Sequence, residues 1–346
     1  MVTIKDIALR LQVSASTVGR ALSNDPRISE KTKEQVRKVA GELGYVANRA
    51  ARMMRGASSN LVGLVVPDIR NSFYSTIAHA LSKCLEQEGL QLMLSESDDD
   101  RQIELQHVRA LIGVDVTGVI LVPSPRTHPD TVRLLQDVPH IQLLRKSEAL
   151  SPQWFGIDDA KALFDATQHL IQLGHRRIGY IGGAIDRPTG AARLQGFRQA
   201  LTSTSPKAVG LEEVAAPADP KFGSLAVRKL LAAPHPPTAL IMGTVQHTNS
   251  ALNELYEMGV QVPQDLSVVG FGNEPGYKWW GPGLTTIGLP VSELATACGL
   301  WFIHQHKQKL AAWPDYNSTS PASLIVRGST ASINPKGIKA RQATSG

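Results

Sequence analysis

The chain is poor in cysteine and in aromatic residues and has no long apolar run. Its two cysteines, Cys84 and Cys298, each stand in an apolar helical pattern, so we expect buried small hydrophobic side chains rather than a disulfide or metal ligands. No segment approaches the ~18 to 20 apolar residues that span a bilayer. The first residues, MVTIKDIALRLQV, lack the pattern of a secretion signal. These absences predict a cytoplasmic globular protein, and 346 residues predict about two or three domains.

Motifs of common enzyme classes are also missing. The chain has no GxxxxGK[ST] phosphate loop and no GxSxG nucleophile elbow, and its histidines show no spacing typical of a metal site. The segment GFGNEPG has the wrong glycine spacing for a dinucleotide-binding turn. His304 and His306, on a predicted late helix, are most simply surface or hydrogen-bonded core groups. We therefore expect no enzymatic activity, no cofactor and no metal.

Positive charge is concentrated near the N-terminus. Residues 1–60 hold 11 Lys and Arg against 5 Asp and Glu, which accounts for the whole net charge of +6, and the remaining residues are balanced. This distribution is typical of a phosphate-binding module joined to a neutral body. A solvated basic helix face without a partner is the alternative.

The same N-terminal residues show the pattern of an all-α helix-turn-helix bundle. Thr3 is placed to cap a first short helix, and Ser14 or Ala15 begins a second helix after a tight turn. A third helix, capped by Ser29, ends at Gly44. Two short helices joined by about three residues form a motif whose second helix enters the major groove of DNA. A three-helix bundle without a ligand is the alternative.

Outward residues at the start of the second helix are the candidates for reading bases. They are Ala15, Ser16 and Arg20. Arg20 is the best of them, because a guanidinium fork can pair with both acceptors of a guanine, for about 1–3 kcal/mol of discrimination. Ser16 and Thr17 suit base or phosphate contacts.

An alanine-rich segment with three arginines follows from Tyr45 to Gly56 and is predicted to form a hinge helix. Here the chain resembles the LacI/GalR family of transcriptional regulators, through TIKDIALRLQVSASTVGRAL and RISEKTKEQVRKVAGELGYVANRAARMMRG. In that family the linker helices of two subunits pair over the minor groove, and one apolar side chain of each wedges between base pairs. Met54 stands at that position in place of the usual leucine, and the contacts that bent DNA allows offset the cost of unstacking. Packing of Met53 and Met54 under the core is the alternative.

The resemblance implies a homodimer on near-palindromic double-stranded operator DNA, because paired readers need two half-sites about one helical turn apart, or a multiple of that. The stretch from Ile333 to Gly346 contains no leucine heptad, which disfavours a tetramerising coiled coil. The residues expected to contact DNA are Thr3, Ala15, Ser16, Thr17, Arg20, Ser29, Thr32, Tyr45, Asn48, Arg52, Met54 and Arg55.

Downstream of residue 60, short apolar strands alternate with amphipathic helices, which is typical of α/β domains with parallel sheets. One series contains LVGLVVP, LQLMLSE, GVILVP and HIQLL, and a second contains RIGYIGG, TALIMG, LSVVGFG and LTTIGLP. Two similar series predict two Rossmann-like lobes that enclose a ligand. The motifs GHRRI, RLQGF and SVVGF further resemble the family's effector domain, which is similar to periplasmic sugar-binding proteins.

The expected organisation follows from these patterns. We expect a helix-turn-helix domain over 1–46, a hinge helix and linker over 47–60, an effector-binding and dimerisation domain over 61–330, and a polar tail over 331–346. Within the effector domain, the N-lobe is expected over about 61–157 plus 290–320, and the C-lobe over about 158–288 plus 322–330.

Candidate effector contacts lie where strands end in the expected cleft. Arg193 is the strongest, because it matches a family arginine that binds sugar hydroxyls or carboxylates, a role that suits the guanidinium fork. A structural ion pair is the alternative for Arg193, and core packing is the alternative for Phe73 and Tyr74. The full set is Phe73, Tyr74, Arg145, Asp158, Arg193, Thr244, Asn273 and Trp279.

Two departures from the family bear on the effector. Thr244-Val245 stands where many sugar-binding members have Asn-Asp, and Gly272-Asn273 stands where they have Asp-Asp. Without these two carboxylates we expect uncompensated arginines in the cleft.

The hypothesis is therefore an anionic effector, such as a sugar acid or a phosphorylated sugar. Arg193, with Arg145 or Arg187, would pair with it, and Trp279 and Trp280 would add an apolar wall. The leading interpretation is a ligand-controlled repressor. The alternatives are a solute-binding protein of a transport system, which the absence of a leader and the presence of residues 1–60 disfavour, and an enzyme.

Overall fold

A computed structural model describes residues 2–45, 59–203, 207–214, 219, 221–308 and 313–333. The chain divides into two compact units, Met1–Ser59 and Asn60–Gly346. Four residues expected to contact DNA, Asn48, Arg52, Met54 and Arg55, lie outside the described residues. Among the described residues no helix is long and apolar enough to cross a bilayer.

The first unit contains three helices: α1 (Ile4–Leu11), α2 (Ala15–Leu22) and α3 (Glu30–Glu42). At the start of each helix, a polar side chain accepts a hydrogen bond from a backbone N–H group that has no partner within the helix. The Asp6 carboxylate accepts from the Thr3 N–H at 2.7 Å, and Ser14 and Ser29 accept from backbone N–H groups three residues later. The three predicted helices are confirmed, and their apolar faces meet in a small core centred on Ile7, Val18, Ala21, Val36 and Ala40.

The second unit begins with a six-stranded sheet in the order β11-β5-β4-β3-β1-β2, and all its pairings are parallel. Its strands are short, and β4, β3 and β1 in its interior are buried throughout because helices cover both faces. The strands are β1 (Leu61–Val66), β2 (Gln91–Glu96), β3 (Gly118–Leu121), β4 (His140–Leu143), β5 (Trp154–Ile157) and β11 (Asn317–Ser320).

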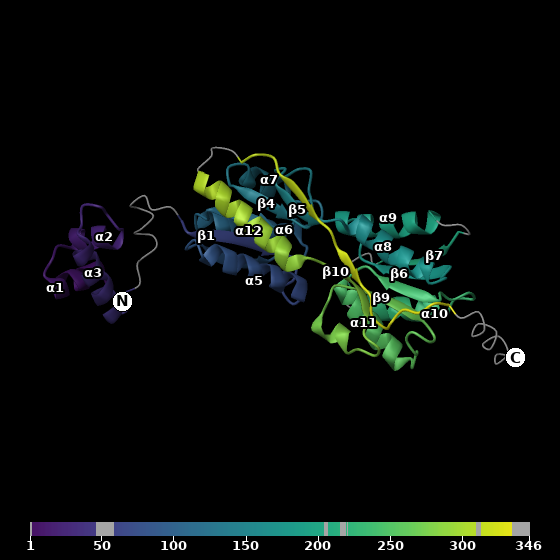
Figure 1. Ribbon diagram of the computed structural model, residues 1–346. Coiled ribbons are helices and arrows are strands. Elements are labelled where there is room, and N and C mark those ends of the chain that lie inside the picture. The colour runs from purple at the N-terminus through teal and green to yellow at the C-terminus, as the bar shows by residue number, and fades with distance from the viewer. Residues whose placement is uncertain are drawn as a thin grey trace. The chain divides into compact units, whose positions relative to one another are not determined.

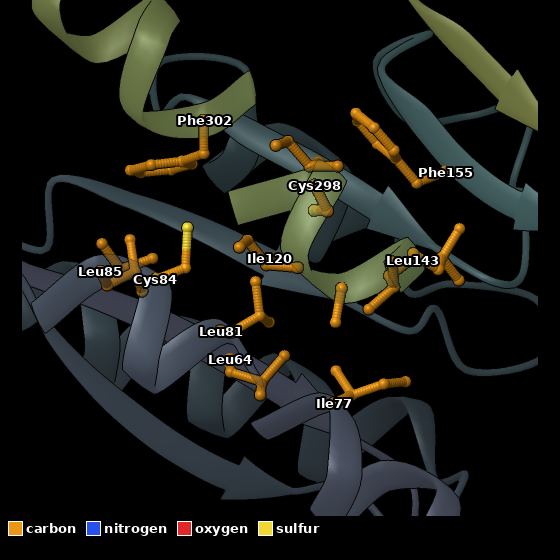
Figure 2. Packing of buried hydrophobic residues seen from close by; sticks show 14 of the residues in the cluster. Leu64, Ile77, Leu81, Cys84, Leu85, Ile120, Leu143, Phe155, Cys298 and Phe302 are labelled. Atoms are coloured by element: carbon orange, nitrogen blue, oxygen red, sulfur yellow. The ribbon is translucent and has the colours of Figure 1, made fainter. Parts of the chain in front are cut away.

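Alternate residues of this sheet point to opposite layers of helices. On one face, Leu64 of β1 packs with helices α5 (Ser72–Glu86) and α12 (Val291–Gln308). On the other face, Val65 packs with α6 (Arg101–Gly113) and α7 (Pro129–Leu135). Figure 2 shows Cys84 of α5 and Cys298 of α12 among apolar side chains of the first core. Both cysteines are free and buried, as expected of small hydrophobic residues.

A second six-stranded sheet, in the order β12-β10-β9-β8-β6-β7, repeats this arrangement. It is parallel except for the β10–β12 pair. Helices α8 (Asp159–Gln172) and α9 (Pro188–Thr202) pack on one face, and α10 (Phe222–Leu231) and α11 (Val245–Glu257) on the other. The strands are β6 (Arg177–Gly182), β7 (Val209–Val214), β8 (Ala239–Met242), β9 (Ser267–Phe271), β10 (Thr285–Gly288) and β12 (Ser323–Ile325), and a 3₁₀ turn covers Pro275–Lys278.

The chain passes between the two sheets more than once. It leaves the first after β5, returns to it through α12 after β10, and crosses again between β11 and β12 (Figure 1). The predicted fold class, an N-terminal all-α bundle followed by an α/β domain of two lobes with parallel sheets, is confirmed. Because parallel strands place their carboxyl ends at one edge, each lobe presents a row of loops there for a ligand.

Candidate DNA-reading surface and effector cavity

The surface of α2 separates core residues from residues that can meet a partner. Val18 and Ala21 are buried, whereas Ala15, Ser16 and Arg20 are exposed. Arg20 forms no ion pair among the described residues of the first unit. Its guanidinium therefore has its hydrogen-bond donors available to a DNA base or phosphate.

Several other predicted DNA-contacting residues also stabilise the ends of helices. Thr3 and Ser29 are exposed cap residues of α1 and α3. Thr17 and Thr32 are half-buried, and their hydroxyls each lie 2.8 Å from the hydroxyl of the preceding cap serine. Tyr45 packs against the core of the first unit. These positions combine a local structural role with access to the surface.

Another arginine of this unit, Arg27, already has an ion-pair partner. The Arg27 side chain hydrogen-bonds both carboxylate oxygens of Asp25, and its guanidinium holds the pKa of Asp25 well below its usual range. Arg27 is therefore paired within the unit, unlike Arg20.

A cavity of about 250 Å³ lies between the two lobes of the second unit, at the carboxyl ends of their strands. One wall comes from the segments that follow β1, β2 and β4, and the other from the segments that follow β6 and β8 and from the end of β9. The structure brings five of the predicted effector-binding residues together here: Phe73, Tyr74, Arg145, Arg193 and Thr244.

Phe73 and Tyr74 face the cavity and also pack against the core of the first lobe. Their rings meet edge to face, with centroids 5.5 Å apart. Burial raises the pKa of the Tyr74 hydroxyl, which keeps it neutral and able to donate a hydrogen bond. Both interpretations of these two residues, core packing and a place in the cleft, therefore agree with their position.

An aspartate bridges two arginines across the cavity. Asp99 of the first lobe forms ion pairs with Arg145 of the same lobe and with Arg187 of the second lobe, the latter at 2.9 Å. All three side chains are largely buried, at 16%, 10% and 17% exposure. Arg145 also donates to the Pro123 carbonyl at 3.3 Å. This group of three side chains, the Asp99 bridge, connects the two lobes directly.

Arg193 is held from three sides. Its Nε donates to the Asp159 carboxylate at 2.6 Å, and its Nη1 donates to the Gly243 carbonyl at 2.9 Å. The guanidinium carbon lies 4.2 Å from the centre of the Phe271 ring, in a cation–π contact. Burial raises the pKa of Asp159, and the Arg193 charge opposes that shift. Arg193 thus forms the structural ion pair considered as an alternative, while still lining the cavity.

The expectation that the cleft holds uncompensated arginines is wrong. Four arginines and three aspartates line the cavity, and Asp159 lies against Arg193 as a fourth carboxylate. Carboxylates from positions other than the two missing ones therefore balance the guanidinium groups.

Three predicted effector contacts lie outside the cavity. Asp158 caps α8, where its carboxylate accepts from the Lys161 N–H at 3.0 Å, and Asn273 accepts from the Arg327 guanidinium at 2.8 Å. Trp279 is 77% exposed, and Trp280 packs at the edge of a second-lobe core. The predicted tryptophan wall is therefore wrong, because neither indole lines the cavity.

Asp99 and Asp159 were not predicted as part of the site, although their positions in the sequence point to it. Asp99 lies in the run Asp98-Asp99-Asp100, directly after β2, and so at the carboxyl edge of the sheet. Asp159 is the neighbour of the predicted Asp158. Ser72 donates to Glu274 of the second lobe at 2.7 Å, a further contact between the lobes that only the folded arrangement reveals.

Comparison with known proteins agrees with both units. Residues 3–48 match the model of bacterial regulatory proteins of the lacI family, and residues 167–330 match a periplasmic binding protein-like domain. The transcriptional repressor CytR of Escherichia coli K12 is 30% identical over 336 residues, which cover 96% of this chain and 97% of CytR. Catabolite control protein A of Priestia megaterium is 29% identical, with 85% and 89% covered.

Solved structures share the fold over nearly the whole chain. The Lac repressor dimer bound to operator and an anti-inducer gives a TM-score of 0.82 at 24% identity, with 95% of this chain and 99% of that chain covered. The complex of the transcriptional regulator CelR with cellobiose gives 0.67 at 26% identity, with 95% and 100% covered. Fold and matches together define a DNA-binding transcriptional repressor. The chain belongs to the LacI family.

Proposed function

We propose that this protein represses transcription as a homodimer on a near-palindromic operator, and that a small molecule bound between its lobes controls operator affinity. The observation that carries the proposal is the cavity lined by both lobes and crossed by the Asp99 bridge. A ligand there touches both lobes at once, so it can favour one arrangement of the lobes over another.

On the DNA side, the proposal assigns base reading to α2. Arg20 is its central residue, because it is exposed, carries a forked set of donors and has no ion-pair partner among the described residues of its unit. The remaining predicted DNA contacts, among them Met54, which lies outside the described residues, stay part of the proposal through the family resemblance.

The homodimer is supported by the family. The Lac repressor, which shares the fold over 95% of this chain, has been solved as a dimer bound to operator. Two DNA-reading units in one dimer match the two half-sites of a near-palindromic operator. Analytical ultracentrifugation of the purified protein is expected to show twice the mass of one chain.

The proposed effector is a carbohydrate-like molecule: a sugar, a sugar acid or a sugar phosphate. The cavity presents guanidinium donors, carboxylate acceptors and the aromatic residues Phe73, Tyr74 and Phe271, a combination that suits hydroxyl groups on a compact ring. The related regulator CelR has been solved with cellobiose.

Coupling between the two sites follows from the contacts between the lobes. An effector that enters the cavity meets the Asp99–Arg187 pair. The Ser72–Glu274 hydrogen bond is a second contact between the lobes, and Ser72 lies between the cavity residues Asn71 and Phe73. Rearranging these contacts changes how the lobes sit, and the resulting effect on operator affinity is reciprocal. An effector that weakens operator binding must bind more weakly to the operator-bound protein.

The test starts from DNA. Genomic fragments retained by the purified full-length protein identify the operator, and the neighbouring genes suggest which metabolites to titrate. A shift in operator affinity with one metabolite, together with saturable binding and no turnover, is the expected result. Failure to retard any fragment at low salt, with and without metabolites, would overturn the proposal. Calorimetric titration with matched neutral and acidic sugars tests the charge of the effector, and preference for the neutral compound contradicts an anionic one.

A further inference from the structure

A second cavity, of about 120 Å³, lies beside the effector cavity. The two cavities share Arg145 and Arg187, so the Asp99 bridge forms part of the boundary between them. The wall of the second cavity includes Arg126, Lys146 and Ser124 from the first lobe and Asp186 from the second lobe. Like the first cavity, it is lined by both lobes.

The balance of charge differs between the two cavities. The effector cavity has as many carboxylates around it as guanidinium groups, once Asp159 is included. The second cavity is lined by four cationic side chains, Arg126, Arg145, Lys146 and Arg187, and by a single acidic one, Asp186. Positive charge in excess is therefore found in the second cavity.

Two further carboxyl groups lie close behind this wall. Asp99 is engaged with both shared arginines. The buried Glu104 accepts from the Ser124 N–H at 2.6 Å, and burial raises the pKa of Glu104, which weakens its tendency to carry a negative charge beside the cavity. Even with Asp99 counted, the cationic groups outnumber the acidic groups around this space.

One polar atom on the wall also lacks a partner. Among the described residues, Nε of Arg187 is buried and has no hydrogen-bond partner, while another nitrogen of the same guanidinium pairs with Asp99. A buried donor of this kind is costly to leave unsatisfied, and a ligand that accepts hydrogen bonds would satisfy it.

We infer that the second cavity binds one phosphate or carboxylate group. This group is either the terminal group of the effector, in which case the inference rests on the proposed function, or a free inorganic anion. Arg126, Arg145 and Lys146 would contact it from the first lobe and Arg187 from the second, so the anion would hold the lobes together. The forked donors of arginine suit the planar or tetrahedral oxygens of such a group.

Inorganic phosphate is the first probe, used on the full-length protein at constant ionic strength with chloride as the reference anion. Phosphate is expected to bind saturably in calorimetry and to raise the Tm. The double variant Arg126→Ala, Lys146→Ala removes two cations that line only the second cavity and is expected to weaken phosphate binding at least tenfold, or about 1.4 kcal/mol. The control Gln246→Ala alters a residue that lines only the effector cavity and is expected to leave phosphate affinity unchanged.

A second arm separates the two sources of the anion. A neutral sugar and its phosphorylated form are titrated into the wild type and the double variant, and loss of preference for the phosphorylated form in the variant assigns the anion to the effector. Phosphate binding without any such preference assigns the cavity to a free anion.

The inference is overturned if phosphate neither binds nor raises the Tm while the phosphorylated sugar has no advantage, or if the double variant binds phosphate as the wild type does. Neutral metabolites that still change operator affinity would then leave the proposed function intact. Conversely, phosphate binding in a protein whose operator affinity responds to no metabolite would contradict only the proposed function.

Discussion

Arginine serves different purposes in the two units of this protein. Arg20 is exposed on α2 without an ion-pair partner among the described residues of its unit, whereas Arg145 and Arg193 are nearly buried and paired with Asp99 and Asp159. An exposed charge costs little to maintain and stays available to DNA, but a buried charge requires a partner because it has lost its hydration. The comparison predicts that the same change, arginine to alanine, affects binding in the first unit and stability in the second.

The largest effect is expected for Arg193→Ala. This change leaves the Asp159 carboxylate buried without its cation, and breaking such a pair costs about 3–5 kcal/mol of unfolding free energy. Denaturant-induced unfolding measures the loss. Arg198→Ala is the matched control, because Arg198 lies on the same helix and its pair with Glu212 is 59% exposed on the arginine side. A loss no greater than that of the control would show that the buried pair does not stabilise the second lobe.

The same rule predicts how stability depends on pH. The buried His247 ring forms no ion pair among the described residues, and burial lowers its pKa to about 4 against a smaller opposing effect of the Asp219 charge. Between pH 4 and the ordinary pKa of about 6.5, the unfolded chain binds a proton at His247 more readily than the folded chain does. The contribution of His247 to the free energy of unfolding is therefore fully present above about pH 6.5 and decreases as the pH is lowered towards 4. The loss attributable to His247 between pH 7 and pH 5 is about 2 kcal/mol.

Thermal unfolding at several pH values measures this dependence. His247→Gln is expected to flatten it, although His140, His169 and His175, whose pKa values burial also lowers, retain part of the slope. His79→Gln, on the exposed face of α5, is the control and is expected to change nothing. An identical pH dependence in wild type and His247→Gln contradicts the assignment.

In the first unit, Arg20→Ala is expected to act on DNA binding. Loss of a bidentate contact to a guanine weakens operator binding by about 1–3 kcal/mol, or roughly fivefold to 150-fold, and relaxes specificity at one base pair. Affinities for the operator and for random DNA at one salt concentration measure the effect. Equal losses on both DNAs would refute the base-reading role, and an unchanged Tm would confirm that the exposed arginine contributes nothing to the fold.

Elements with a strong apolar pattern could be predicted from the sequence, and polar elements at the sheet edges could not. Strands β1 and β8 are buried along their whole length and read as apolar runs. Strand β11, with the residues NSTS, carries no such pattern and is defined by its parallel pairing with β5, while β7 is a half-exposed edge strand with two glutamates. Tertiary pairing, rather than local pattern, makes these segments strands.

The residues of the candidate site also fall into two groups, those that could be predicted from the sequence and those that only the folded structure brings together. Tyr74 and Arg145 follow strand ends, so the position of the strands was enough to predict them, whereas Arg193, within α9, was predicted from its match to a family arginine. The partners Asp99 and Asp159 depend on how the lobes and helices meet in space. Asn273 was misplaced because Gly272, at φ +87°, lets the chain turn after Phe271, and Asn273 then bonds Arg327 instead of facing the cavity.

The smallest effect is expected at the start of the DNA-reading helix. The Ser14 hydroxyl accepts from the Thr17 N–H at 3.0 Å, and removal of such a cap costs about 1 kcal/mol. Ser14→Ala is therefore expected to lower the stability of the first unit, measured by the protection of its amides against hydrogen exchange, without changing that of the second. Ser16→Ala, in the same exposed turn but without a cap role, is the control. Equal protection in the two variants would mean that the apolar contacts of Val18 and Ala21, and not the cap, hold α2 in place.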